Sequence, residues 1–231
     1  MKNSLSVAKL KLVEGLRAMG IFYAISILFV FIMWYLSVKY DNVSYNSDSA
    51  TLIFLFVLGL NGFKDSFKLS SANGVSRKRY FRESLLALVG IAALAALIES
   101  VLPLISQSFT RHEMLYTTIY RSTGLIAAYT WTFALYCFAL MAGWLINLVY
   151  YRSGSLMKIV FSLSPFFVIL LLIGLNKLTG GSVYIAIGNF ISFYWGFTDS
   201  NSYVAMLNLL ATSLLFSGLI FLLLRRAPVK E

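Results

Sequence analysis

The sequence predicts an all-α integral membrane protein with six transmembrane helices, an N-terminal interfacial helix and an outer re-entrant hairpin before the last span. Hydrophobic residues make up 59% of the 231 residues and charged residues only 12%, against about 45–50% and 25% in soluble domains. Six apolar runs approach the length that crosses a bilayer. Most Lys and Arg residues fall in segments on one predicted side. We therefore treat 1–231 as a single transmembrane domain.

The first segment, 1–19, predicts an amphipathic helix that lies in the membrane interface before the first crossing. Its apolar positions recur at helical spacing, at Leu5, Ala8, Leu12, Leu16 and Met19. Lys9, Lys11 and Glu14 lie elsewhere on the helical wheel, as expected for a helix with one face in the headgroups. The segment has no small-residue cleavage site, so we expect it to stay attached.

Six apolar runs follow, each close to the roughly 20 residues needed to cross the hydrocarbon. The predicted spans cover 20–38, 49–66, 84–106, 122–150, 159–176 and 202–224. In the fourth span, Gly143 lies among large aromatic residues, which indicates either a close contact between helices or a substrate path, and we favour the close contact. In the fifth, Pro165 indicates a helix start or a kink.

Positive charge orients these spans. Of the 19 Lys and Arg residues, 15 fall in the N-terminal segment, in 62–84, at Arg152 and Lys158, and after the last span. The other four are Lys39, Arg111, Arg121 and Lys177. Because segments rich in Lys and Arg stay in the cytoplasm, we expect both termini to be cytoplasmic. Anionic membrane lipid and an acidic protein partner, not nucleic acid, then explain the net charge of +10.

Residues 179–199 are apolar enough to suggest a seventh crossing. A seventh crossing would place Arg225 and Arg226 outside, against the distribution of positive charge. The segment is interrupted by Gly181, Gly188 and Gly196 and is rich in aromatic residues. We therefore predict a re-entrant or interfacial hairpin on the outer side, with its unpaired backbone groups covered by protein.

Motifs for catalysis are absent from the sequence. It contains no G-x-x-x-x-G-K-[ST] phosphate-binding loop, so any ATP must be bound by another chain. The single histidine, His112, lies in a predicted outer loop away from the serines of the spans, which argues against a metal site or a hydrolase. We expect no enzyme activity, no catalytic or metal-binding residue and no cofactor on this chain.

Glu99 is the acid that lies well inside a predicted span, and an intramembrane acid is by default a functional candidate. We predict that it contributes to a substrate path. The alternative is that Glu99 reaches the outer headgroups or hydrogen-bonds a neighbouring Ser or Tyr. A proton-coupled carrier would need more than one such group, so coupling to a proton gradient is not expected.

The loop 62–84 carries six Lys or Arg residues together with aromatic residues, which indicates a docking surface. Asn73-Gly74 breaks the chain. Val75, Tyr80 and Phe81 are expected to form an apolar plug within a charged rim, suited to a cleft with acidic edges. The candidate residues are Asn73, Gly74, Val75, Ser76, Arg77, Lys78, Arg79, Tyr80 and Phe81. Anionic lipid is the alternative partner, but lipid attraction needs charge alone and leaves the aromatic pair unexplained.

This combination of layout and motif resembles an ABC type-2 exporter permease. The segment A-N-G-V-S-R-K-x-x-F is similar to an Asn/Gly-Ile/Val-Ser-Arg-Lys signature of that family, which forms a short helix contacting the ATPase. The layout covers the entire chain, whereas the motif covers about ten residues. The resemblance implies a multi-pass protein of a bacterial cell membrane.

The resemblance also implies the partners and the substrate. Two copies of a separate ATPase subunit would bind ATP and Mg, and a second permease chain would complete a dimer. The first, second and fifth spans would line part of a path at the dimer interface. The compact size resembles members that export drugs or peptides, so the implied substrate is hydrophobic or amphipathic.

Two other classes of protein fit the layout. A channel or carrier independent of an ATPase would show intramembrane ion ligands or matched helix breaks. A membrane scaffold or immunity protein fits the predicted topology but leaves the basic aromatic loop unexplained. Co-purification with a soluble ATPase separates the three classes.

The charge distribution predicts that position 76 is cytoplasmic and position 108 is outside. Single cysteines replacing Ser76 and Ser108, in a Cys137→Ala background, should therefore react differently with an impermeant thiol reagent added to intact cells. We expect labelling at position 108 and none at position 76. Labelling of position 76 would contradict the orientation.

Overall fold

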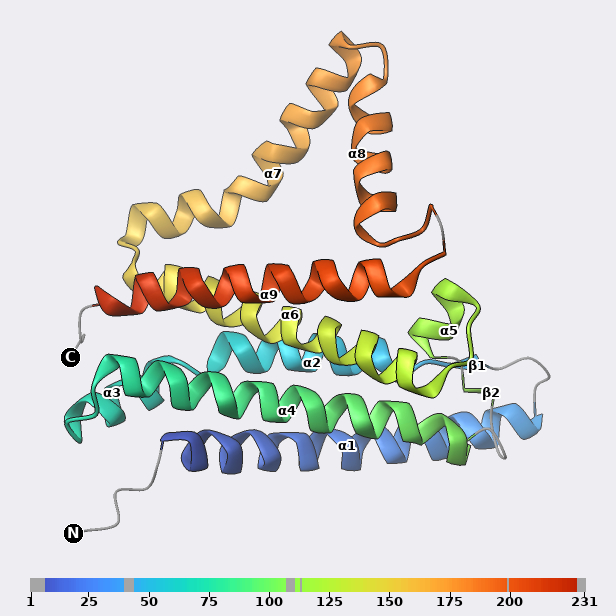
Figure 1. Cartoon of the computed structure of the whole chain (residues 1–231), viewed down its shortest axis with the longest axis horizontal. Helices are drawn as coiled ribbons and strands as arrows, with labels where there is room; N and C mark the ends of the chain where they lie inside the picture. The colour runs from blue at the N-terminus through green and yellow to red at the C-terminus, as the bar shows by residue number, and fades with distance from the viewer. Residues whose placement is uncertain (1–6, 40–43, 107–110, 113, 199, 228–231) are drawn as a thin grey trace.

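The computed structural model describes residues 7–39, 44–106, 111–112, 114–198 and 200–227, and its secondary structure is almost entirely helical (Figure 1). The helices are α1 (Val7–Lys39), α2 (Asp48–Asn61), α3 (Lys64–Ala72), α4 (Arg77–Ser106), α5 (Leu115–Tyr120), α6 (Leu125–Arg152), α7 (Ser155–Leu178), α8 (Ser182–Tyr194) and α9 (Ser202–Arg225). Two-residue strands β1 (Ser44–Tyr45) and β2 (Arg111–His112) pair in parallel. Within the described residues, six helical segments are long and apolar enough to cross a membrane, which is the number that the sequence predicts.

Helix α6 forms the centre of the bundle and lies against α2, α4 and α9 (Figure 1). Helix α6 carries apolar side chains on all its faces, and a helix of that kind is buried rather than amphipathic. The buried side chains include Trp131, Tyr136 and Trp144, which the sequence placed in one span. Their burial positions the other spans around a single apolar core.

Glycines bring α2 and α6 into backbone contact. A Cβ atom on Gly59 would lie 2.5 Å from the Leu140 carbonyl oxygen, and one on Gly143 would lie 2.3 Å from the Phe56 carbonyl oxygen. The Asn147 side-chain amide also donates to the Leu60 carbonyl of α2. The predicted close contact at Gly143 is confirmed, because only a residue without a side chain fits there.

Small residues on α4 allow α1 and α6 to approach its buried face. The residues of that face recur at helical spacing and include Ala87, Ala92, Ala95, Ala96 and Ser100. Glu99 lies on the same face. The acid is therefore enclosed by neighbouring helices.

The predicted separate interfacial helix at 1–19 is not seen. Residues 7–39 form one uninterrupted helix, since Gly20 alone does not stop a helix that contains no proline. The buried positions of its first half are Val7, Lys11, Gly15 and Met19. Lys11 therefore lies on the packed face, against the wheel prediction, and Leu5 lies outside the described residues.

The predicted loop 62–84 is largely helical. It contains α3 and the first two turns of α4, and only short turns separate these from α2 and from each other. The sequence predicted a loop here because the charged residues lower the mean hydropathy of the segment below that of the flanking spans. Charged side chains on an exposed helical face are nevertheless compatible with helix.

Helices α7 and α8 leave the bundle as a hairpin (Figure 1). Pro165 lies inside α7, so it does not start that helix. The turn to α8 contains Gly180 and Gly181, both with positive φ, and Gly196 ends the hairpin, also with positive φ. Gly188 is internal to α8 and does not break it, because glycine lowers helix stability without preventing helix formation. A 13-residue helix is too short to cross a bilayer, and re-entry into the membrane stays a prediction.

We expect Gly59→Ala and Gly143→Ala each to destabilise the protein by about 2 kcal/mol, because the added methyl group meets backbone that cannot rotate away. Gly218→Ala in α9 is the matched control, since a Cβ there meets no atom within 4 Å. Thermal unfolding of the purified protein in detergent measures the effect. Equal melting temperatures for Gly143→Ala and Gly218→Ala would contradict the contact.

Candidate functional site

The turn between α3 and α4 is a rigid helix cap. The Val75 amide donates to the Ser70 carbonyl at 3.0 Å and the Gly74 amide donates to the Ser71 carbonyl at 3.1 Å, which is the Schellman arrangement. Gly74 has φ of +72°, a conformation that glycine adopts without steric cost. The predicted break at Asn73-Gly74 is confirmed, and it is a fixed turn.

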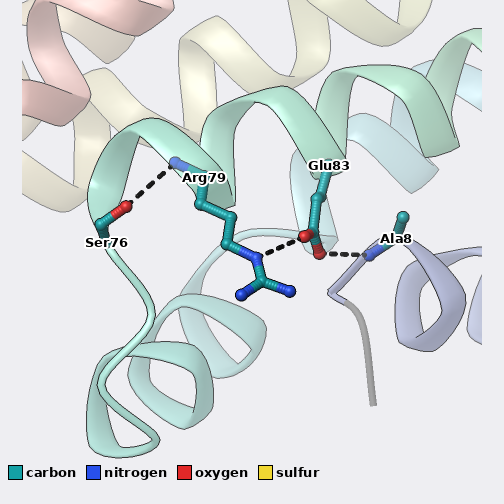
Figure 2. Close-up of polar contacts among 4 residues, drawn as sticks. All are labelled: Ala8, Ser76, Arg79 and Glu83. Atoms are coloured by element: carbon teal, nitrogen blue, oxygen red, sulfur yellow. Dashed lines mark hydrogen bonds and ion pairs between the residues drawn. The ribbon is translucent and has the colours of Figure 1, made fainter. Parts of the chain in front are cut away.

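Hydrogen bonds connect this turn to the start of α1, as Figure 2 shows. The Ser76 hydroxyl accepts a bond from the Arg79 amide at 3.4 Å and so caps α4. The Arg79 side chain pairs with Glu83 at 2.7 Å, and the same carboxylate accepts from the Ala8 amide at 3.2 Å. Ala8 lies in the first turn of α1, where a negative charge is favourable. A displacement of this turn would therefore act on α1 as well as α4.

Two arginines secure the end of α9 at the same end of the bundle. Arg77 donates to the Arg225 carbonyl at 2.7 Å, and Arg152 donates to the Leu223 carbonyl at 3.3 Å. The last carbonyls of a helix lack intrahelical partners, and cations near them are stabilising. Arg77, predicted as part of a rim for a partner, therefore already has an intramolecular role.

The predicted plug points inward. Tyr80 is 1% exposed and its ring lies against those of Phe63 and Phe67, while its hydroxyl is 2.8 Å from the Ser66 hydroxyl. Phe81 stacks on Trp144. Tyr80 is core because α3 packs over it, whereas Phe81 is partly buried between Trp144 of α6 and Phe221 of α9. The spacing of the two residues in sequence does not reveal either arrangement.

A basic surface remains at the α3–α4 tip. We define it by its exposed residues Leu69, Asn73, Lys78, Arg79 and Arg82. Leu69 is 52% exposed and supplies the apolar part that the prediction assigned to Tyr80 and Phe81. Its position between Lys68 and Ser70 of a polar helix was the signal in the sequence, because a leucine there has no apolar neighbour on either side.

Beneath the basic surface, Lys11 is buried among aromatic rings. Its Nζ lies 4.9 Å from the Tyr80 ring centroid and 5.2 Å from that of Trp144, distances at which a cation is attracted to the ring face. Sequence reasoning missed this contact. The four-residue spacing of Val7, Lys11, Gly15 and Met19 was a signal for it.

Glu99, at the other end of α4, is enclosed by hydroxyl groups. It is 0% exposed, and its oxygens accept hydrogen bonds from Tyr23 at 3.2 Å, Ser47 at 2.5 Å and Thr51 at 2.5 Å. This geometry agrees with the alternative stated from the sequence, in which Glu99 hydrogen-bonds a neighbouring Ser or Tyr and does not line a path. No part of the carboxyl group is open to a path, and its contact with substrate stays a prediction.

Asp48 lies beside Glu99, which sequence reasoning missed. Asp48 is 1% exposed and is the first residue of α2, directly after Ser47. The predicted span began at residue 49, so this acid was assigned to the outer connection. An acidic residue that follows a serine at a helix start is a helix-initiation signal and would have extended the helix to include it.

Comparisons with protein-family models, with curated proteins and with solved structures find no match to this chain.

The Schellman turn predicts a specific order of stabilities at position 74. Gly74→Ala should destabilise the protein by about 1–2 kcal/mol, because a side chain is strained at this φ, whereas Gly74→Asn should cost less, since asparagine tolerates this region. Gly188→Ala is the matched control, because no atom lies within 4 Å of a Cβ there. Thermal unfolding measures the order, and Gly74→Ala as stable as wild type would contradict it.

Proposed function

We propose that this chain is the permease subunit of an ATP-driven exporter of the ABC type-2 kind, in which a separate ATPase binds the basic surface. ATP and Mg would be bound by two copies of that ATPase, and a second copy of this chain would complete the transporter. The exported molecule would be hydrophobic or amphipathic. Both termini and the basic surface would face the cytoplasm of a bacterial cell.

The observation that carries this proposal is the construction of the α3–α4 tip. In Figure 1 it extends from the end of the bundle at which α1 begins and α9 ends. Its turn is closed by backbone hydrogen bonds, and Glu83 connects it to α1. A surface that only attracts anionic lipid needs neither feature. A partner that pulls on the tip would need both, because force reaches the spans only through rigid contacts.

The chemistry of the tip favours a protein partner with an acidic rim. Lys78 and Arg82 are exposed, and Leu69 offers an apolar side chain between the charges. Charged rims accelerate association and select partners, while the apolar centre contributes most of the affinity. Leu69, instead of the packed Tyr80 and Phe81, would make the apolar contact with the partner.

The substrate class is supported by two apolar grooves along α1 and α4. They have volumes of about 350 and 380 Å³, and both are lined by Ile27, Val30 and Leu102 among others. Volumes of this size suit small ligands or part of a peptide. Charged molecules would lose hydration in such a groove without gaining a partner.

A second copy of the chain is supported by the surface of α7 and α8. In the part of the chain that the structure describes, neither helix has a buried residue, although both are apolar. Lipid can cover an apolar helix, but the hairpin also stands away from the bundle (Figure 1). A second permease chain would supply the packing that a lone hairpin lacks.

One observation favours the second candidate, a carrier driven by an ion gradient. The sequence offered a single intramembrane acid, whereas the structure brings Asp48 and Glu99 together. Intramembrane acids that lie together occur on ion and proton pathways. In such a carrier the basic surface would have no ATPase partner, so the following experiment separates the two candidates.

Reversal of charge on the basic surface should weaken ATPase binding. We expect Lys78→Glu with Arg82→Glu to reduce co-purification of the ATPase with the tagged permease by tenfold or more, and Leu69→Ser to reduce it further. Lys177→Glu on α7 is the control, because it makes the charge reversal that each of these two substitutions makes, on an exposed residue away from the tip. The ATPase is the subunit that co-purifies with the wild-type chain from its own host and shows ATP hydrolysis.

Two results would contradict the proposal. One is that no ATPase accompanies the wild-type chain and that transport in vesicles proceeds without ATP. The other is that the variants of the basic surface retain ATPase and substrate-stimulated hydrolysis as fully as Lys177→Glu does. Melting temperatures close to that of the wild type establish that the variants are folded.

A further inference from the structure

Two carboxyl groups share one enclosed site at the end of the bundle opposite the basic surface. Asp48 is 1% exposed and Glu99 is 0% exposed, and their side chains face each other. Within the described part of the chain, neither carboxyl group forms an ion pair with a basic side chain. Two buried negative charges without a cation are strongly unfavourable.

Glu99 accepts three hydrogen bonds from hydroxyl groups. One oxygen accepts from Tyr23 and Thr51, and the other accepts from Ser47. The Ser47 and Thr51 hydroxyls each donate to Glu99 at 2.5 Å. Three donors therefore surround Glu99, and a carboxyl group has acceptor capacity beyond these three bonds.

Asp48 is satisfied on one side only. Its Oδ2 accepts a hydrogen bond from the Leu115 amide at 2.8 Å. Its Oδ1 is buried and has no hydrogen-bond donor among the described residues. An ionised carboxylate has no proton to donate to a second carboxylate. The approach of Asp48 to Glu99 therefore requires something positive between them.

We propose that Asp48 and Glu99 bind one small monovalent cation, a proton or a sodium ion, between Asp48 Oδ1 and the Glu99 carboxylate. Carboxylate and hydroxyl oxygens are hard donors that suit such a cation. The Ser47 and Thr51 hydroxyls donate hydrogen bonds to Glu99, and a hydroxyl oxygen can also act as an acceptor. Calcium fits poorly, because it takes six to eight oxygen ligands and Asp48 Oδ1, the Glu99 carboxylate and the two hydroxyl groups offer at most five.

One negative charge remains after the cation binds, and its surroundings stabilise it. The hydroxyl groups around Glu99 donate to it, and the site lies at the N-terminus of the 14-residue helix α2, where negative charge is favoured. The titratable side chains that face the pair from neighbouring helices are Tyr23 of α1 and Tyr136 of α6, whose hydroxyl donates to the Asp48 carbonyl at 3.5 Å.

The cation would fasten four elements to one another. Tyr23 belongs to α1, Ser47 to Thr51 lie at the start of α2, Glu99 belongs to α4, and Leu115 begins α5. Loss of the cation leaves two negative charges side by side in an apolar environment. The ends of α2 and α4 would then separate or admit water, which opens the bundle at this end.

Thermal unfolding of the purified full-length chain, without any ATPase, tests the site. A cation that binds only the folded state stabilises it by mass action. In a sodium series against choline at constant ionic strength and pH, a sodium site raises the melting temperature by roughly 5 °C or more near saturation. In a pH series without sodium, a proton site lowers the melting temperature as pH rises, because the ligand becomes scarcer.

Asp48→Asn is the informative variant, because the asparagine amide can donate to Glu99 in place of the cation. We expect it to fold and to lose the sodium or pH dependence. Asp65→Asn is the matched control, since Asp65 is exposed at the opposite end of the bundle, and it should keep the dependence.

The wild-type protein alone can overturn the proposal, whether or not the variant folds. A melting temperature that varies neither with sodium nor with pH would do so. Persistence of the full dependence in a folded Asp48→Asn protein would do so as well. Because no ATPase is present, these results are independent of the proposed export function.

Discussion

Backbone contact between α2 and α6 is the constraint on which the rest of this fold depends. Gly59 and Gly143 allow the two helices to approach until any side chain would strike the opposite backbone. In a bilayer, where lipid is as apolar as leucine, such close packing is what holds helices together. With α6 fixed against α2, its remaining surface accepts α4 and α9, and α1 packs on α4 (Figure 1).

Polar groups within this bundle follow from the same packing. The closeness of α1, α2 and α4 encloses Glu99 together with hydroxyl groups, and it brings Asp48 against the same carboxylate. Each of these side chains would be costly alone in an apolar environment. Among the described residues, Asp48 Oδ1 is the carboxyl oxygen of this site that has no hydrogen-bond donor, and this gives the site its chemical interest.

The positive residues at the opposite end divide into two groups. Arg77, Arg152 and Lys11 act within the chain, at the end of α9 or over aromatic rings. Lys78 and Arg82 are exposed at the α3–α4 tip. Because the internal arginines and Glu83 hold the tip against α9 and α1, a partner at the tip would act on the bundle through existing contacts. A rigid tip suits mechanical coupling better than a flexible loop would.

The sequence by itself determined the all-α class, the six helices long and apolar enough to span a membrane, the break at Asn73-Gly74 and the close contact at Gly143. These follow from hydropathy, from backbone freedom and from side-chain size along the chain. It did not determine which residues face inward. Lys11, Tyr80 and Phe81 were assigned to exposed surfaces and are packed or partly buried, and Asp48 was assigned to a connection and lies beside Glu99. Only the tertiary structure decided these positions. A helical pattern identifies a face, but whether lipid, water or another helix covers that face depends on partners far away in the sequence.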